Sequence, residues 1–438
     1  MIGTGTRPVS ARSLAMKFRE PLPALIAIPV CNEAERIGAC LAALGAQDGA
    51  GEQSVVLLLN NCTDATASIV DGWRDNPRFR LHVEQTSLPP SRASAGVARA
   101  LAMRSAARIA ARSCTGRFVL LTTDADGTVP NGWVAANLDA ITNGADAVCG
   151  RAVIDPVEAA LIPARLHEDD ARECAYGDLL EEIAAALDPD PADPWPRHAE
   201  NSGASIAVTG CAYHAVGGVP PTLAGEDRAF IEALRRMDAK IRHAPSISVT
   251  VSGRIIGRAS GGMADTIRRR LVAPDPMLDD RLESTAVAVR RARLRRAVRD
   301  LHSGDVADVG KVGALLRLAP NRLARLLDAP RFGMAWAAIE AASSRLARRP
   351  VPVSELPQQT AHAREIVAWL RAGGRFDPTT QIHVHPAAPP IAARTLHEQL
   401  GRGMADERRK WPNTTPLHTS MSQSARPAQP SAANDVFS

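Results

Sequence analysis

The sequence predicts an α/β fold in which helices cover a doubly wound, mainly parallel sheet. Short apolar runs recur between residues 24 and 262, for example at 25–30, 54–59 and 118–121, and such runs are typical of strands buried on both faces. Segments rich in alanine or with apolar residues near a helical spacing separate these runs. Strands that alternate with helices in this way predict a mainly parallel sheet.

The predicted elements follow one another without long gaps. Thr63 or Asp64 can cap the helix that follows the second strand. The predicted strands span residues 25–30, 54–59, 79–83, 118–121, 146–153, 203–208, 240–243 and 247–251. The predicted helices span residues 37–44, 65–74, 92–111, 132–143, 167–187, 210–216 and 226–237. Residues 188–197 carry four prolines and are predicted to form a loop, which we interpret as an insertion on the substrate side.

Composition divides the rest of the chain. We expect a flexible leader at residues 1–23, an α/β domain at 24–262, a helical extension at 263–385 and a disordered tail at 386–438, which is polar and rich in Pro, Ser and Thr. The extension is alanine- and arginine-rich, with helices predicted at 282–301, 309–327 and 334–346. Its arginine run at 290–296 is expected to be a solvated helix face; binding to anionic lipid or polyphosphate is the less favoured interpretation.

The length, composition and cysteine content of the chain exclude several classes of protein. The chain has 438 residues, is 45% hydrophobic and 23% charged, and so resembles an ordinary globular protein. Its seven cysteines form no C-x-x-C pattern, which indicates free thiols in a reducing cytoplasm. No apolar run reaches the roughly 18 residues needed to cross a bilayer. We expect a cytoplasmic protein, with peripheral membrane contact as the alternative, and no nucleic acid partner, because no aromatics interleave with the arginines.

Two carboxylates follow the buried run at 118–121. Asp124 and Asp126 lie where the strand ends, and ligands of open α/β sheets bind outside the carboxyl ends of the strands. Two like charges there require a cation, and Mg²⁺ or Mn²⁺ is usually held by one or two carboxylates together with substrate phosphates. The pair therefore predicts a metal bound to a diphosphate. The alternative is two solvated aspartates that open a turn with Gly127 and Pro130.

The order of four motifs resembles the family 2 glycosyltransferases of the GT-A fold, over somewhat more than half of the chain. Residues 28–33 are similar to the family's I-P-x-x-N-E, and residues 61–66 to its x-S-T-D-x-T. Residues 123–133 are similar to its D-x-D followed by P-x-x-W. Gly225-Glu226-Asp227, preceded by a G-G-V-P loop at 217–220, is similar to the E-D pair that opens the acceptor-side helix.

The resemblance implies a bacterial, non-processive enzyme that transfers one sugar from a nucleotide-diphosphate donor to an acceptor hydroxyl, with inversion and with Mn²⁺ or Mg²⁺. Asp126 and Asp124 would hold the metal, Asp227 would be the catalytic base, and Glu226 would assist it by binding the acceptor. Inversion needs a carboxylate that takes the acceptor proton opposite the leaving group. The donor-binding residues that the resemblance implies are Pro29, Asn32, Glu33, Asn60, Asn61, Arg99, Asp124 and Ala125.

The sequence also departs from the family pattern. An aspartate usually ends the second strand and binds the base, but here Leu59 is followed by Asn60, so a UDP-sugar is only the default donor. The processive Q-x-x-R-W motif is absent after Asp227. Contacts of His243, Arg254 or Arg258 with the diphosphate remain open.

Two other functions compete with sugar transfer. A sugar nucleotidyltransferase shares a nucleotide-binding sheet and a carboxylate-bound metal, and it would use residues 3–7 to cradle phosphates. A non-catalytic relative would bind a nucleotide sugar or serve in an assembly through the helical extension. We favour the glycosyltransferase because both carboxylate sites are intact.

Overall fold

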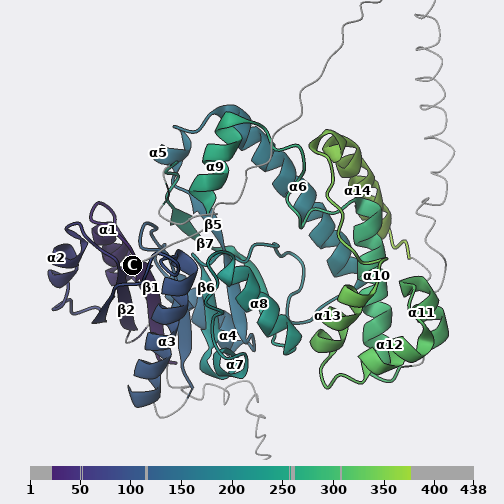
Figure 1. Ribbon diagram of the computed structural model, residues 1–438, viewed down its shortest axis with the longest axis horizontal. Coiled ribbons are helices and arrows are strands. Elements are labelled where there is room, and N and C mark those ends of the chain that lie inside the picture. Colours follow the sequence, from purple (N-terminus) through teal and green to yellow (C-terminus); the bar gives the residue numbers. More distant parts are fainter. Residues whose placement is uncertain are drawn as a thin grey trace, which may run out of the picture. The chain divides into compact units, whose positions relative to one another are not determined.

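The computed structural model describes residues 22–49, 51, 53–113, 117–255, 257, 262–305 and 308–375, drawn as coloured ribbon in Figure 1. The expected leader, apart from residues 22 and 23, lies outside the described residues, as do Arg258 and the expected tail at 386–438.

Within the described chain, seven strands form one sheet in the order β3-β2-β1-β4-β6-β5-β7. The strands are β1 Ala24–Val30, β2 Gln53–Asn60, β3 Arg80–Thr86, β4 Val119–Thr122, β5 Ala147–Ile154, β6 Ile206–Thr209 and β7 Ile241–Val251. Strand β1 pairs in parallel with β2 and β4, β2 with β3, and β5 with β7. Strand β6 alone among them runs antiparallel, to both β4 and β5. The predicted α/β fold with a mainly parallel sheet is confirmed.

Helices cover both faces of this sheet, because side chains alternate between the faces along each buried strand. Ile26 and Ile28 of β1 belong to one core with residues of three helices: α1 Ile37–Gly45, α2 Thr66–Asp71 and α4 Trp133–Thr142. Leu25 and Ala27 belong to the opposite core with residues of three others: α3 Ala95–Ser113, α7 Gly210–Ala215 and α8 Glu226–Arg236. The doubly wound arrangement is therefore present.

Several predicted boundaries were wrong. The helix predicted from Arg92 begins at Ala95. The strands predicted at 240–243 and 247–251 are one strand, β7, whose register against β5 shifts between Cys149 and Arg151. The bulge lets the strand pair with β5 again from Ser248, beyond Pro245, which interrupts the apolar pattern. The segment predicted as helical at 309–327 contains two helices, because Arg317 ends the first in a left-handed conformation and Pro320 starts the second.

The remaining helices extend the fold beyond the sheet (Figure 1). They are α5 Pro156–Ala159, α6 Ala164–Leu187, α9 Met263–Val272, α10 Thr285–His302, α11 Val309–Leu316, α12 Pro320–Leu327, α13 Phe332–Ala342 and α14 Leu356–Arg371. Helices α10 to α13 enclose a small core of their own, which includes Val298, Leu323 and Trp336. The long helix α6 packs against α10 and α14. In the described chain no helix is both long and apolar enough to cross a membrane.

The arginine run of α10 is only partly a solvated face, so that expectation was wrong for several of its members. The Arg291 side chain is 12% exposed and is paired with Glu283 and Glu340. Arg295 and Arg299 are paired with the buried Asp188, which follows α6. These arginines face carboxylates on other segments because the helix lies at a packing interface rather than at the edge of the molecule.

Candidate active site

The carboxyl ends of β1, β2 and β4 open into one large cavity of about 1960 Å³. Pro29, Asn60 and Asp126 line it from the strand ends, and Asp227 lines it from the first turn of α8. The topology places these residues together because the strand ends of a parallel sheet meet at one edge. Residues that the sequence separates by about 200 positions thus share one cavity, which also extends along α6 and α10.

Arg99 of α3 joins the two acidic groups of this cavity. Its buried guanidinium donates from Nη2 to Asp124 Oδ1 at 2.6 Å and from Nε to Glu226 Oε1 at 2.9 Å. Nη1 donates to Thr122 Oγ1 at 2.8 Å and to the Gly203 carbonyl at 2.9 Å. Burial alone would lower the pKa of Arg99, but the charges of Asp124 and Glu226 outweigh it and hold the pKa above its usual value. Arg99, predicted to bind the donor, is here engaged by protein groups.

Arg254, which follows β7, makes a similar contact with the second aspartate. It donates from Nη1 and Nη2 to the Glu33 carboxylate at 3.0 and 2.8 Å, and Nη2 lies 2.8 Å from Asp126 Oδ2. Burial, followed by the charge of Asp124, raises the pKa of Asp126 to about 6, although Arg254 opposes this shift. A carboxylate that is this costly to ionise fits a site that receives a further cation.

The candidate metal ligands are few. Among the described residues no group of three or more His, Cys, Asp or Glu side chains could hold a metal ion. Asp124 and Asp126 remain as a two-carboxylate set, which is the usual protein share of a Mg²⁺ or Mn²⁺ site completed by substrate phosphates. The residues present therefore fit a divalent metal bound together with a diphosphate.

Two predicted donor-binding asparagines hold loops in place. Asn32 has a left-handed backbone (φ 52°), and its Oδ1 accepts from the backbone N–H of Thr63 at 2.7 Å and of Asp64 at 3.2 Å. Asn61 (φ 54°) exchanges two 2.9 Å hydrogen bonds with the backbone of Leu88. Both amides fix the turns after β1 and β2, and neither contact points to a ligand by itself.

Asn60 differs from its neighbours. Its side chain is buried, lines the cavity, and leaves Oδ1 without a hydrogen-bond partner among the described residues. An unpaired buried acceptor costs about 1–3 kcal/mol, so a ligand that donates a hydrogen bond there would be favoured. Pro29 and Ala125 also line the cavity and contribute shape rather than charge.

Glu226 and Asp227 are adjacent but face different partners. Gly225, with φ 68°, turns the chain into α8 in a conformation that favours glycine. Glu226 is buried against Arg99. Asp227 Oδ2 accepts from the backbone N–H of Gly203 at 3.0 Å, and Oδ1 accepts from that of Arg228 at 2.7 Å. Asp227 is therefore held by neutral donors, whereas Glu226 is already neutralised by an arginine.

Comparison with known proteins identifies the part of the chain that carries Arg99, Asp124 and Asp126. Residues 25–179 match the family model described as Glycosyl transferase family 2. The chain carries a family 2 glycosyltransferase domain. It is an enzyme that transfers glycosyl groups, and the resemblance to this family seen in the sequence is confirmed. No match was found among curated proteins.

Solved structures resemble this transferase only distantly. A mannosyltransferase from Pyrobaculum calidifontis, solved with GDP-Man and Mn²⁺, is 18% identical with a TM-score of 0.37; the match covers 81% of this chain and 86% of that one. TarS residues 1–349 from S. aureus, solved with UDP-GlcNAc, is 15% identical with a TM-score of 0.40; the match covers 84% of this chain and 98% of that one. Both TM-scores lie below 0.5, which is too low to transfer a property to this chain.

Two groups of the transferase site could not be found from the sequence motifs. Thr122 and the backbone of Gly203 complete the surroundings of Arg99, and Gly203 also binds Asp227. A Cβ at Gly203 would lie 2.7 Å from Arg99 Cζ, so the close approach requires glycine. Arg254 was one of three open candidates, and His243 is buried away from solvent. The sequence shows only that Gly203 is a glycine near the start of a strand, a feature too common to indicate a site residue.

Proposed function

We propose that this enzyme transfers one sugar from a nucleotide-diphosphate donor to an acceptor hydroxyl with inversion, and that Asp227 is the catalytic base. The observation that carries this proposal is that Asp124, Asp126 and Asp227 line one cavity. We also propose that the transferase domain spans residues 24–262 and that residues 263–385 form a helical extension, as the change in composition indicates.

The donor half of the site is formed by the strand ends. Asp124 and Asp126 would hold Mn²⁺ or Mg²⁺, which when bound stabilises the negative charge that develops on the leaving diphosphate. Arg99 fixes Asp124 through the 2.6 Å ion pair, so one metal ligand is oriented before any ligand arrives. The unpaired Asn60 Oδ1 supports a contact with the nucleobase of the sugar donor. An amide oxygen can accept a hydrogen bond from an N–H group of uracil or of a purine.

The acceptor half is formed by the start of α8. The acceptor hydroxyl gives its proton to the Asp227 carboxylate while its oxygen forms the new bond to the anomeric carbon. The bond between that carbon and the diphosphate oxygen breaks, and its electron pair leaves with the diphosphate. Asp227 lies in the first turn of α8 and lines the cavity, so its carboxylate is placed to accept this proton. Glu226 accepts a hydrogen bond from Arg99 and so helps to hold this arginine, which in turn is paired with Asp124.

Asp227→Asn tests the assignment because it keeps the shape of the side chain and removes the basic oxygen. We expect turnover to fall by about 10²- to 10⁴-fold with donor affinity unchanged. Release of nucleoside diphosphate from a panel of nucleotide sugars with Mn²⁺ measures turnover, and calorimetry measures donor binding. Arg236→Gln, at an exposed position of the same helix that does not line the cavity, is the control and should keep wild-type turnover. Full turnover of Asp227→Asn would sink the assignment of the base.

A further inference from the structure

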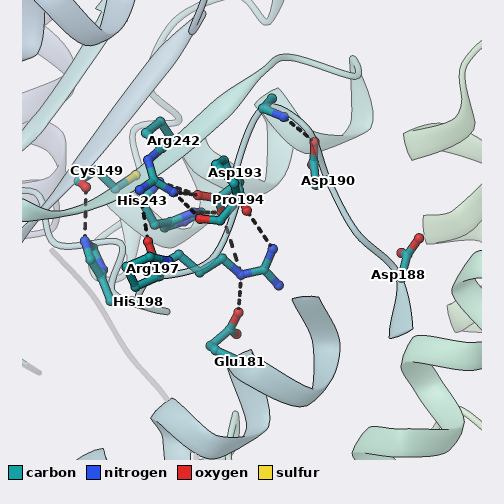
Figure 2. A network of polar contacts seen from close by, with 12 residues as sticks. Cys149, Glu181, Asp188, Asp190, Asp193, Pro194, Arg197, His198, Arg242 and His243 are labelled. Carbon is teal, nitrogen blue, oxygen red and sulfur yellow. Dashed lines mark hydrogen bonds and ion pairs between the residues drawn. The ribbon is translucent and has the colours of Figure 1, made fainter. Parts of the chain in front are cut away.

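The loop between α6 and β6 is fixed by a buried polar network that the transfer chemistry itself does not use. Asp193 is its centre (Figure 2). Asp193 Oδ2 accepts from His243 Nδ1 at 2.7 Å, and Oδ1 accepts from the His243 backbone N–H at 2.9 Å. Both side chains are at most 9% exposed. The loop is thereby attached to β7, the last strand of the sheet.

Further contacts hold the same loop on either side. Arg242 of β7 donates to the carbonyls of Pro194 at 2.6 Å and Pro196 at 2.9 Å. Arg197 donates to Glu181 of α6 at 2.8 Å and to the Asp193 carbonyl at 3.1 Å. Figure 2 shows Arg242 of β7 and Arg197 of the loop directed at Asp193 and Pro194, with Glu181 of α6 against Arg197. A loop that satisfies this many polar groups internally has one conformation rather than several.

The network leads directly to the proposed base. His243 Nε2 lies 3.1 Å from the side-chain Oδ1 of Asn201, which is itself buried. Two residues later, the Gly203 N–H donates to Asp227 Oδ2 at 3.0 Å, and the Gly203 carbonyl accepts from Arg99 at 2.9 Å. The group that orients Asp227 from outside α8 is therefore a backbone N–H at the end of this loop.

We propose that Asp193, His243 and Asn201 are positioning residues, which set the place of the Gly203 N–H and through it the orientation of the Asp227 carboxylate. The inference rests on the proposed role of Asp227. Because Gly203 has no side chain, the path of the loop decides where its N–H lies. An error of about 1 Å in the position of a reacting group can cost about 100-fold in rate, so a buried pair remote from the reaction can control turnover.

Asn201→Ala and Asp193→Asn test the proposal in the full-length protein. Asn201→Ala removes only the contact between His243 and Asn201. Asp193→Asn removes the carboxylate that binds His243, so this variant is the more destabilising of the two. We expect each to lower kcat by about 10- to 100-fold with the KM for the nucleotide sugar within about twofold of wild type. Thermal unfolding confirms that the variants are folded.

Asp188→Asn is the matched control. Asp188 is a buried aspartate of the same loop, but its partners are Arg295 and Arg299 of α10 rather than β7. This variant should lose stability and keep kcat. An equal loss of kcat in Asp188→Asn would show that any change that loosens this loop lowers kcat. The specific positioning role of Asp193, His243 and Asn201 would then be overturned.

A double-mutant cycle separates positioning from general damage. If Asn201 acts through Asp227, adding Asn201→Ala to Asp227→Asn leaves the residual kcat within about twofold, because the group being positioned no longer accepts a proton. Multiplied losses would reject the positioning role while the base assignment stands. If Asp227→Asn alone keeps full turnover, the base assignment fails instead, so the two failures are distinguishable.

Discussion

In the proposed metal site, Arg254 and a divalent cation would compete for the same carboxylate. Arg254 lies 2.8 Å from Asp126 and also binds Glu33. We therefore expect Arg254→Gln to raise the affinity of the donor-free protein for Mn²⁺ by about fivefold, because one ion pair worth about 1 kcal/mol no longer competes with the metal. Calorimetric titration with Mn²⁺ measures this affinity.

The metal prediction has two controls. Arg36→Gln removes a neighbouring arginine whose partner is Glu158 rather than Asp126, and it should leave the Mn²⁺ affinity unchanged. Asp126→Asn should abolish Mn²⁺ binding in the same titration. Unaltered Mn²⁺ binding by Asp126→Asn would remove this residue from the metal site.

His198 makes the stability of the protein dependent on pH. Its ring is buried, Nε2 donates to the Cys149 carbonyl at 3.1 Å, and Nδ1 accepts from the Glu200 N–H at 3.1 Å. Both nitrogens are occupied in the neutral form, so a second proton would break the contact with Glu200. Burial, followed by the charge of His243, lowers the pKa of His198 to about 4.

The sign of the pH effect follows from this lowered pKa. Between about pH 4 and pH 6.5 the unfolded chain binds a proton at His198 that the native protein does not, so stability rises with pH across this window. The contribution is present in full above pH 6.5 and is on the order of 3 kcal/mol. Urea unfolding at pH 4.5 and 7.5 should show a smaller difference for His198→Gln than for wild type. The exposed His167→Gln should behave as wild type, and an equal pH dependence in all three proteins would contradict the prediction.

At the scale of elements, the strands of the sheet and helices α10 to α13 could be predicted, whereas α9 and α14 could not. The runs at 25–30, 54–59 and 118–121 are buried on both faces, so they carry a strong apolar signal. Helices α9 and α14 were not predicted individually, because their arginines and alanines resemble the exposed segments around them. Pairing of β7 across Pro245 depends on a bulge opposite β5, which no local pattern reports.

The candidate site also has a part that could be predicted from the sequence and a part that could not. Asp124, Asp126 and Asp227 were located by motifs within single turns. The partners of Arg99 were not, because Glu226 lies 127 residues away along the chain and Gly203 lies 104 residues away. Such contacts follow from the crossover of strands in the sheet, and spacing along the chain does not report them. Arg99 was consequently predicted to face the donor.

Adjacent arginines of α10 should respond oppositely to substitution. Arg291 is paired with Glu283 and Glu340, whereas the buried Nε of Arg290 has no hydrogen-bond partner among the described residues. Burial, followed by the charges of Arg345, Arg349 and Arg317, lowers the pKa of Arg290 below its usual value, although the charge of Glu283 opposes this shift. Three of the four charged side chains that act on Arg290 are therefore positive, as Arg290 itself is.

We expect Arg290→Gln to raise the free energy of unfolding by a few tenths of a kcal/mol, about the size of a like-charge contact on a helix. Arg291→Gln should lower it by about 3–5 kcal/mol, since it leaves the buried Glu283 unpaired. Urea unfolding at low and high salt measures both, and added salt should shrink the gain from Arg290→Gln. A loss of stability in Arg290→Gln would contradict the prediction.

At the scale of the whole described molecule, the helical extension is joined to the transferase domain by specific caps. Asp238, just after α8, accepts from the first backbone N–H groups of α13, at Phe332 (3.0 Å) and Gly333 (2.7 Å). Tyr176 of α6 donates to the Glu283 carbonyl at 2.7 Å, ahead of α10. Residues of one part thus complete the helix ends of the other, and the two parts should unfold together.

Gly333→Ala tests this close approach. A Cβ at Gly333 would lie 1.9 Å from the Arg235 carbonyl oxygen, so α8 and α13 would have to move apart. We expect a loss of about 1–3 kcal/mol in the free energy of unfolding, as is typical of overpacking. Gly38→Ala is the control, because nothing lies within 4 Å of a Cβ there, and it should stabilise α1. Wild-type stability of Gly333→Ala would show that the contact is easily relaxed.

The Arg99 contacts also limit how this enzyme can be recombined with its relatives. The matched family segment ends at residue 179, yet Arg99 within it is satisfied by Gly203 and Glu226 beyond it. A chimera joined near residue 180 would bring Arg99 and Asp124 from one parent and their acceptor-side partners from another. Unless that parent supplies a carboxylate and a glycine at the matching places, a buried arginine is left without partners. Because Arg254 is also paired with Glu33 and Asp126, successful chimeras should exchange residues 24–262 as one piece.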